Sequence, residues 1–233
     1  MCIRDSNLNA LKEMERRRAV DKVKELVDEA YLYGAKILVL CSGPDPGESK
    51  RSDASASLIK SLKEICNYAI EKAKGYTLAI SLETFDREID KRLFMGPTWE
   101  AVGIAKEVME EYENFGLTLD LSHLPLLGEN PVESVRIAGD YLNNVHLGNC
   151  VLRDLNHPQY GDKHPPLCIE GGEVCIGEVK AFLRALRDVG YFDKETPTTL
   201  PTVMFEVRPR AGEDPQTVIN ASKRLFIEAW TSI

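Results

Sequence analysis

Several features that would assign this chain to a common class of protein are scarce or absent. No run approaches the roughly 18 apolar residues of a membrane span, and the start of the sequence lacks the apolar core of a secretory signal peptide. Acidic residues outnumber basic residues by 37 to 29, for a formal net charge of -8, which disfavours the phosphate backbone of a nucleic acid as a partner. We therefore expect a cytoplasmic protein that binds neither a membrane nor a nucleic acid.

Metal-binding cysteine pairs are also missing. The six cysteines show no CxxC spacing and lie mostly in apolar or loop contexts. The absence of CxxC pairs argues against a structural zinc site, and reduced thiols are the expectation for a cytoplasmic chain. The cysteines are Cys2, Cys41, Cys66, Cys150, Cys168 and Cys175.

The sequence has no glycine-rich dinucleotide fingerprint and no internal repeat. Short apolar runs instead alternate with longer helical patterns, which is typical of parallel strands joined by helices. Gly116 is the predicted end of the third helix, just before a strand, and 148–172 is predicted to be a long loop over the site. The predicted strands are 35–41 and four that end at Glu83, Asp120, His146 and Glu206; the six predicted helices are 7–34, 53–74, 97–116, 130–144, 179–192 and 214–230.

The beginning of the chain is unusual. Residues 1–6, MCIRDS, resemble the translation of a sequencing-library adapter and are set aside as an artefact, which leaves a domain over 7–233. The chain proper then begins near Asn7, within a predicted helix, so we expect a truncated domain. The arginine run at 16–18 is predicted to be a solvated helix face.

Four predicted strands end on a side chain of a type that binds metal ions. These are Glu83 in LAISLETFD, Asp120 in LTLDLSH, His146 in NNVHLGN and Glu206 in TVMFEVRP. Parallel strands aim their C-terminal ends at one face, where the catalytic residues of an α/β barrel converge. One histidine and three carboxylates would thus meet at one point, and the sequence predicts a divalent-cation site.

The same motifs resemble those of the xylose isomerase-like barrels, the sugar isomerases and epimerases typified by D-tagatose 3-epimerase and D-psicose epimerase. The resemblance covers roughly residues 30–230 and rests on the Glu of SLETFD, the Asp-x-x-His of DLSH, the His of VHLGN and the Glu of FEVRP, in this order. It implies an α/β fold, a TIM (β/α)8 barrel of which about the last five strands are present.

The resemblance also implies an activity. Glu83, Asp120, His146 and Glu206 would bind one divalent cation, with Mn²⁺ favoured and Mg²⁺ or Co²⁺ as alternatives, because three carboxylates and one imidazole suit such ions. Glu83 and Glu206 match the acid/base pair of the family. They would move a proton of a sugar or sugar-like ketose through a metal-stabilised enediolate, so we expect an isomerase or epimerase.

Three further residues are candidates for contact with the substrate. His123 matches the histidine of the Asp-x-x-His motif, and Arg153 roughly matches an arginine that holds substrate oxygens. His157 and His164 lie in a proline-rich loop, where exposure to solvent is the simple expectation. The segment 162–164, Asp-Lys-His, nevertheless has the D-x-H spacing that the endonuclease IV branch of the superfamily uses for an additional zinc ion, and His164 is kept as a candidate.

Two alternatives stay open. An apurinic endonuclease of the same fold needs a three-metal cluster, with a histidine where this chain has Cys41 and Ser42, and its polyanionic substrate suits an acidic protein poorly. The other alternative is a non-catalytic barrel fragment. An epimerase should take one ion, the nuclease three and the inert fragment none. We also expect a truncated chain to be impaired as an enzyme and to associate with further copies through its flanking strands.

Overall fold

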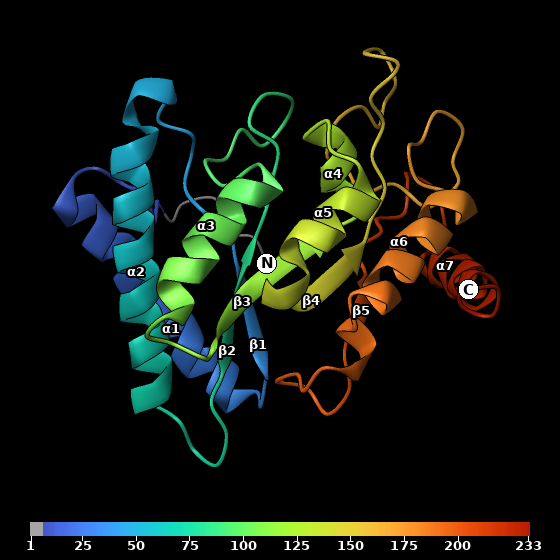
Figure 1. The fold of residues 1–233 in the computed structure, drawn as a ribbon. Helices are drawn as coiled ribbons and strands as arrows, with labels where there is room; N and C mark the ends of the chain where they lie inside the picture. Colours follow the sequence, from blue (N-terminus) through green and yellow to red (C-terminus); the bar gives the residue numbers. More distant parts are fainter. Residues whose placement is uncertain (1–6) are drawn as a thin grey trace.

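The computed structural model describes residues 7–233, so the adapter-like segment 1–6 lies outside the described residues. Five parallel strands pair in chain order to form one sheet, which is an open half of a β/α barrel (Figure 1). This is the predicted fold class. The strands are β1 (Ile37–Leu40), β2 (Ala79–Glu83), β3 (Phe115–Asp120), β4 (Leu142–Leu147) and β5 (Val203–Phe205).

Helices alternate with the strands, and helices that follow one another pack side by side, as α1 does with α2, α2 with α3 and α6 with α7. The described residues hold seven α-helices rather than the six predicted. The helices are α1 (Glu13–Leu32), α2 (Arg51–Glu71), α3 (Thr98–Met109), α4 (His123–Leu126), α5 (Pro131–Ala138), α6 (Ile176–Asp188) and α7 (Pro215–Trp230), with 3-10 turns η1 (Glu48–Lys50), η2 (Gly139–Tyr141) and η3 (Tyr191–Asp193).

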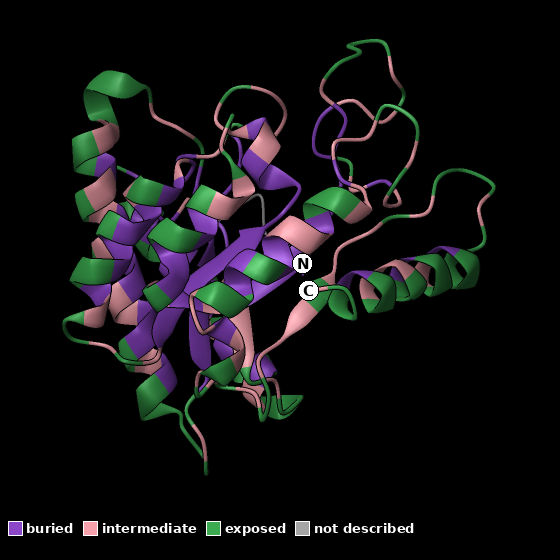
Figure 2. Cartoon of the chain, turned by 45° about the vertical axis from the view of Figure 1, so that its right-hand side comes forward, coloured by how far each residue is buried: buried purple, intermediate pink, exposed green. Residues whose placement is uncertain are grey.

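The core lies between the central strands and the inner faces of the helices (Figure 2). Every residue of β2 and β3 is buried, whereas the edge strands β1 and β5 are mostly half-buried because each pairs with a single strand of the described sheet. Association through these edges stays a prediction. None of the helices within 7–233 combines the length and the hydropathy that crossing a membrane requires.

The start of the described chain differs from the prediction. Residues 7–10 form a turn, and α1 begins only at Glu13. Asn9 fixes the turn against the loop after β1, because its amide accepts a hydrogen bond from Gly43 N at 2.6 Å. The prediction of a solvated arginine face is wrong for Arg16, whose side chain is only 2 % exposed and lies 2.7 Å from a carboxylate oxygen of Glu64 on α2.

The prediction that Gly116 ends a helix is also wrong. It lies within β3, and α3 already ends at Met109. A Cβ at this position would lie 2.5 Å from Asn143 Cγ, and the Asn143 side chain in turn accepts a hydrogen bond from Ser81 Oγ at 2.6 Å. The glycine therefore admits a close side chain from β4 rather than ending a helix.

The irregular segment after β4 is a long loop, as predicted, but it holds a disulfide. Cys168 and Cys175 are bonded, with their Cα atoms 4.3 Å apart. The prediction of reduced thiols is wrong for this pair, since the loop folds back so that Cys168 N donates to Val174 O at 2.9 Å. Cys66 and Cys150 carry no disulfide.

Candidate metal centre

Four adjacent strands each deliver one candidate metal ligand to the same end of the sheet. Glu83 and Asp120 are the last residues of β2 and β3, and His146 is the last but one residue of β4. Glu206 follows β5, where its N–H donates to Leu147 O at 3.1 Å. Asp120 and His146 are direct partners in the ladder between β3 and β4. Parallel pairing thus brings all four side chains to the same end of the sheet.

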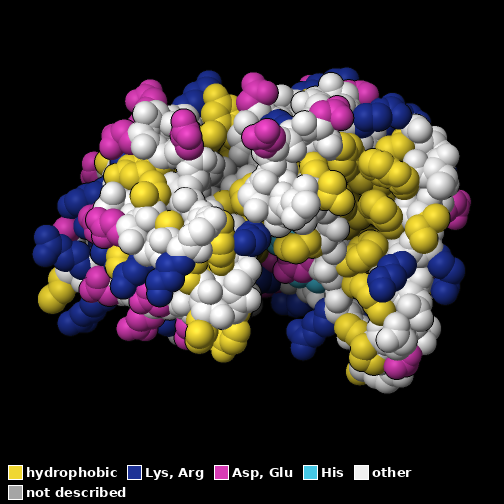
Figure 3. All heavy atoms as spheres, turned by 90° about the horizontal axis from the view of Figure 1, so that it is seen from below, with side chains coloured by type: hydrophobic (Ala, Val, Ile, Leu, Met, Phe, Trp, Pro, Cys, Tyr) yellow, Lys and Arg dark blue, Asp and Glu magenta, His cyan; other side chains and the backbone are white. Residues whose placement is uncertain are grey.

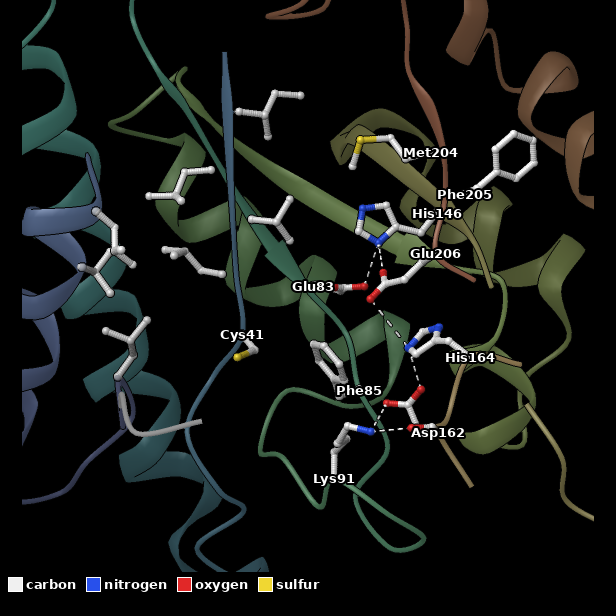
Figure 4. Close-up of a pocket in the computed structure, with 17 residues that line it drawn as sticks. Cys41, Glu83, Phe85, Lys91, His146, Asp162, His164, Met204, Phe205 and Glu206 are labelled. Atoms are coloured by element: carbon white, nitrogen blue, oxygen red, sulfur yellow. Dashed lines mark hydrogen bonds and ion pairs between the residues drawn. The ribbon is translucent and has the colours of Figure 1, made fainter. Parts of the chain in front are cut away.

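The ligand atoms meet around one nitrogen of His146. Its Nδ1 lies 2.7 Å from Glu206 Oε2, 3.1 Å from Glu83 Oε1 and 3.7 Å from Asp120 Oδ2. Figure 4 shows Glu83, His146 and Glu206 pointing toward one another. One ligand atom from each of the four residues lies within 4.8 Å of all the others. This spread matches one cation with ligand distances of about 2.0–2.6 Å.

Unsatisfied polar atoms support the fit to a cation. Asp120 Oδ1 accepts hydrogen bonds from the N–H and the hydroxyl of Ser122, both at 2.6 Å, whereas Asp120 Oδ2 is buried and has no hydrogen-bond partner. A buried carboxylate oxygen without a partner is costly, and a cation would satisfy it. Three carboxylates and one imidazole suit Mn²⁺ or Mg²⁺, and zinc also accepts such ligands.

The pKa values of the two candidate acid/base glutamates are shifted in opposite directions. Burial raises the pKa of Glu83. Burial also acts to raise the pKa of Glu206, but the hydrogen bond from His146 and the nearby histidine charges outweigh it and lower this pKa to about 2. Environments that push the pKa values of two carboxyl groups apart are a feature of acid/base pairs.

A second group of polar side chains lies beside the four ligands. His123 Nδ1 lies 2.8 Å from the carbonyl oxygen of Thr84, to which it can donate, so its Nε2 faces Asp162 Oδ1 at 3.4 Å. His164 Nε2 lies 2.8 Å from the same oxygen. Asp120, His123 and His164 also meet the distance condition for a metal-binding group. The loop after β4 thus returns to the site, and simple exposure is wrong for His164.

Arg153 is not brought to this site. Its side chain is 80 % exposed, and its guanidinium lies 3.0 Å from Glu173 in the same long loop. His157 also stays away from the ligands, where its Nδ1 accepts a hydrogen bond from Gln159 N at 3.1 Å. Contact of Arg153 with a substrate stays a prediction without support from this geometry.

Three residues of the site were not predicted from the sequence. Asn144 Nδ2 lies 3.0 Å from His146 Nε2 and so helps to orient the ring. Phe85 packs on His123 with ring centroids 4.4 Å apart. Lys91 Nζ lies 2.8 Å from Asp162 Oδ2. Of these, only Asn144 carried a signal, since it lies two residues before His146 on one face of a strand.

A cavity of about 570 Å³ adjoins the ligands. Polar groups including Glu83, His146 and Glu206 line one part, and apolar side chains of β1 and β5 line the rest. Figure 3 shows acidic and histidine side chains in a hollow of the surface, with hydrophobic side chains gathered on one flank. The candidate ligands are therefore reachable by a small molecule.

The chain belongs to the family described as Xylose isomerase-like TIM barrel, which matches residues 2–219. Among curated proteins it is similar to the uncharacterized protein MJ1614 of Methanocaldococcus jannaschii, with 26 % identity over 187 residues, or 80 % of this chain. The chain spans 65 % of the length of that relative.

Solved structures of similar fold include a D-tagatose 3-epimerase-like protein, with a TM-score of 0.72 and 20 % identity over 98 % of this chain and 74 % of that one. A second is the IOLI protein with a binding zinc atom, with a TM-score of 0.71 and 18 % identity over 96 % and 73 % of the two chains. A third is 3-keto-D-glucoside 4-epimerase of E. coli, with a TM-score of 0.64 and 16 % identity over 94 % and 74 %. At these identities the likeness establishes the fold.

Proposed function

We propose that the chain carries the metal centre and the acid/base pair of a divalent-metal-dependent isomerase or epimerase of a sugar or sugar-like ketose. The observation that carries the proposal is the convergence of Glu83, Asp120, His146 and Glu206 at the C-terminal ends of four parallel strands. Solved structures of similar fold include a sugar epimerase and a protein described with a bound zinc atom. Mn²⁺ is the favoured ion, with Mg²⁺ and Co²⁺ as alternatives.

The two glutamates would do the proton transfer. A bound divalent cation would polarise the ketose oxygens and stabilise developing negative charge. Glu206 has a lowered pKa and is ionised at neutral pH, so it can accept the proton from the carbon next to the carbonyl. Glu83, whose pKa is raised by burial, would return a proton to that carbon. Transfer between carboxylates on opposite faces of the carbon inverts that carbon.

The remaining polar groups would position the substrate. The His123 ring is fixed between Phe85 and the carbonyl of Thr84, and His164 Nε2 lies 3.7 Å from Glu206 Oε1 at the mouth of the cavity. His164 can donate a hydrogen bond to a substrate hydroxyl group, whereas the buried His123 would act through its contact with Asp162. The half-exposed side chain of Glu206 lines the cavity that would receive the sugar.

Solvent deuterium exchange tests the proposal. The chain is incubated with Mn²⁺ in D₂O and with D-tagatose, D-fructose or D-psicose, and deuterium on the carbon next to the carbonyl is followed by NMR. We expect exchange in the wild type, loss of exchange in Glu206→Gln and Glu83→Gln, and no change in the control Glu88→Gln, whose side chain is exposed. Exchange that survives in both site variants would exclude the acid/base role.

The second group of side chains favours one other candidate, the metal-dependent apurinic endonuclease. His123, Asp162 and His164 supply donors that an additional ion could use. Against it, Cys41 and Ser42 stand where the nuclease branch needs a histidine, and the net charge is -8. Cleavage of an abasic-site duplex with three ions bound would favour the nuclease over the epimerase.

A further inference from the structure

Lys91 lies inside the site although it comes from the loop between β2 and α3. Its side chain is only 17 % exposed, and its ammonium contacts both the carbonyl oxygen of Asp162, at 2.6 Å, and Asp162 Oδ2, at 2.8 Å. Asp90 Oδ2 lies 3.6 Å away. The backbone holds the residue as well, since Lys91 N donates to Asp86 Oδ2 at 2.8 Å. The position of this positive charge is therefore fixed by the fold.

Asp162 is the carboxylate on which a second ion would depend. Its Oδ1 is buried without a well-formed hydrogen bond and lies near the Nε2 atoms of His123 and His164, while its Oδ2 faces Lys91 (Figure 4). His123 Nε2 is likewise buried and unpaired. The donors are those that divalent metals accept. Asp162 thus has ion-site geometry, with one cation, the Lys91 ammonium, already on its Oδ2.

The net charge of the side chains around Asp162 differs from that of the four ligands. Glu83, Asp120 and Glu206 carry three negative charges, so one divalent ion leaves that site with a net negative charge. Asp162 and Lys91 cancel, and His123 and His164 bring no negative charge. Asp120 also lies within ligand distance of these two histidines, but an ion in the first site would already neutralise it. A divalent ion beside Asp162 would therefore meet no net attraction from its own donors, and it would face both the ammonium and the first ion at close range.

We propose that the Lys91 ammonium, held on the second oxygen of Asp162, neutralises this carboxylate and so restricts the site to a single divalent cation. The inference rests on the proposed function for the first ion only. It gives Lys91 a positioning role, because the ammonium holds Asp162, which in turn contacts both histidines near the cavity.

The matched control is Lys163, the neighbouring lysine. Lys163 Nζ lies 2.9 Å from Asp90 Oδ2, and its side chain is 44 % exposed. It has the same charge and, like Lys91, directly follows an aspartate, but it makes no ion pair with Asp162. Loss of Lys163 should therefore leave the metal count unchanged.

The test is the stoichiometry of Mn²⁺ binding by calorimetry, together with electron paramagnetic resonance, which separates isolated from spin-coupled Mn²⁺. We expect one ion in the wild type, two coupled ions in Lys91→Met, and one ion in Lys91→Arg and Lys163→Met. Circular dichroism verifies that each variant is folded. Two ions in the wild type, or the same number of ions in folded Lys91→Met as in the wild type, would overturn the inference.

A second pair of variants keeps the outcome separate from the fate of the first site. His146→Gln should bind Mn²⁺ much more weakly than the wild type, whereas the double variant Lys91→Met/His146→Gln should bind one ion tightly through the second group. No ion in the wild type with one in Lys91→Met would refute the proposed function and support the role of Lys91. One ion in both the wild type and Lys91→Met would support the metal centre of the proposed function and refute the role of Lys91.

Discussion

His146 offers the sharpest test of the metal centre, because the atom that faces the other ligands carries a proton in the free protein. Burial lowers the pKa of His146, but the carboxylates of Glu206 and Glu83 outweigh burial and raise it to about 10. At pH 7 the imidazole is therefore protonated. A cation can bind Nδ1 only by displacing that proton.

The size of the effect follows from this pKa. A pKa of about 10 lies about three units above pH 7, so the neutral imidazole is about one part in 10³, equivalent to about 4 kcal/mol of binding free energy. The association constant for Mn²⁺ should therefore rise about tenfold per pH unit between about pH 7 and pH 9. The association constant rises with pH because Mn²⁺ binding releases protons.

Calorimetry can count the released protons directly. Mn²⁺ binding is measured at one pH in two buffers of different ionisation enthalpy, and the difference gives the number of protons. We expect His146→Asn to bind more weakly and to release about one proton fewer than the wild type. A binding constant that does not change with pH, or an equal proton count in His146→Asn, would refute the reasoning.

Stability of the metal-free protein should depend on pH in the opposite sense. The raised pKa of His146 stabilises the fold fully below the unfolded value of 6.5, and this contribution is lost as the pH rises toward about 10. The melting temperature without metal should thus fall between these limits. Saturating Mn²⁺ should remove the His146 part of that fall.

Three further predictions concern the fold. In urea titrations, Arg16→Met should lower the free energy of unfolding by about 1–3 kcal/mol, because it removes the ion pair of a buried side chain. The control Arg17→Met, at a side chain 70 % exposed, should change it by less than about 0.5 kcal/mol. Gly116→Ala should cost about 1–3 kcal/mol by overpacking, and an unchanged urea midpoint would contradict the close contact with β4. Thiol titration of the unfolded protein should find two more groups after reduction, from the Cys168–Cys175 disulfide.

The sequence alone determined the order of elements and the four candidate ligands. Buried parallel strands are nearly continuous apolar runs, so a charged or imidazole side chain at the end of such a run stands out, as Glu83 and Asp120 do. Parallel strands also share one direction. Knowing that His146 and Glu206 end their strands was therefore enough to place them at the same edge of the sheet.

Tertiary structure decided what surrounds those ligands. Lys91 and Asp162 come from loops, where no period relates a residue to a direction in space, so their contact could not be inferred from spacing. The same holds for Arg16, which looks like a solvated charge in the sequence but is covered by α2 in the fold. Strand ends are fixed by local pattern and by the common direction of the strands, whereas loop contacts depend on long-range packing that only the folded chain defines.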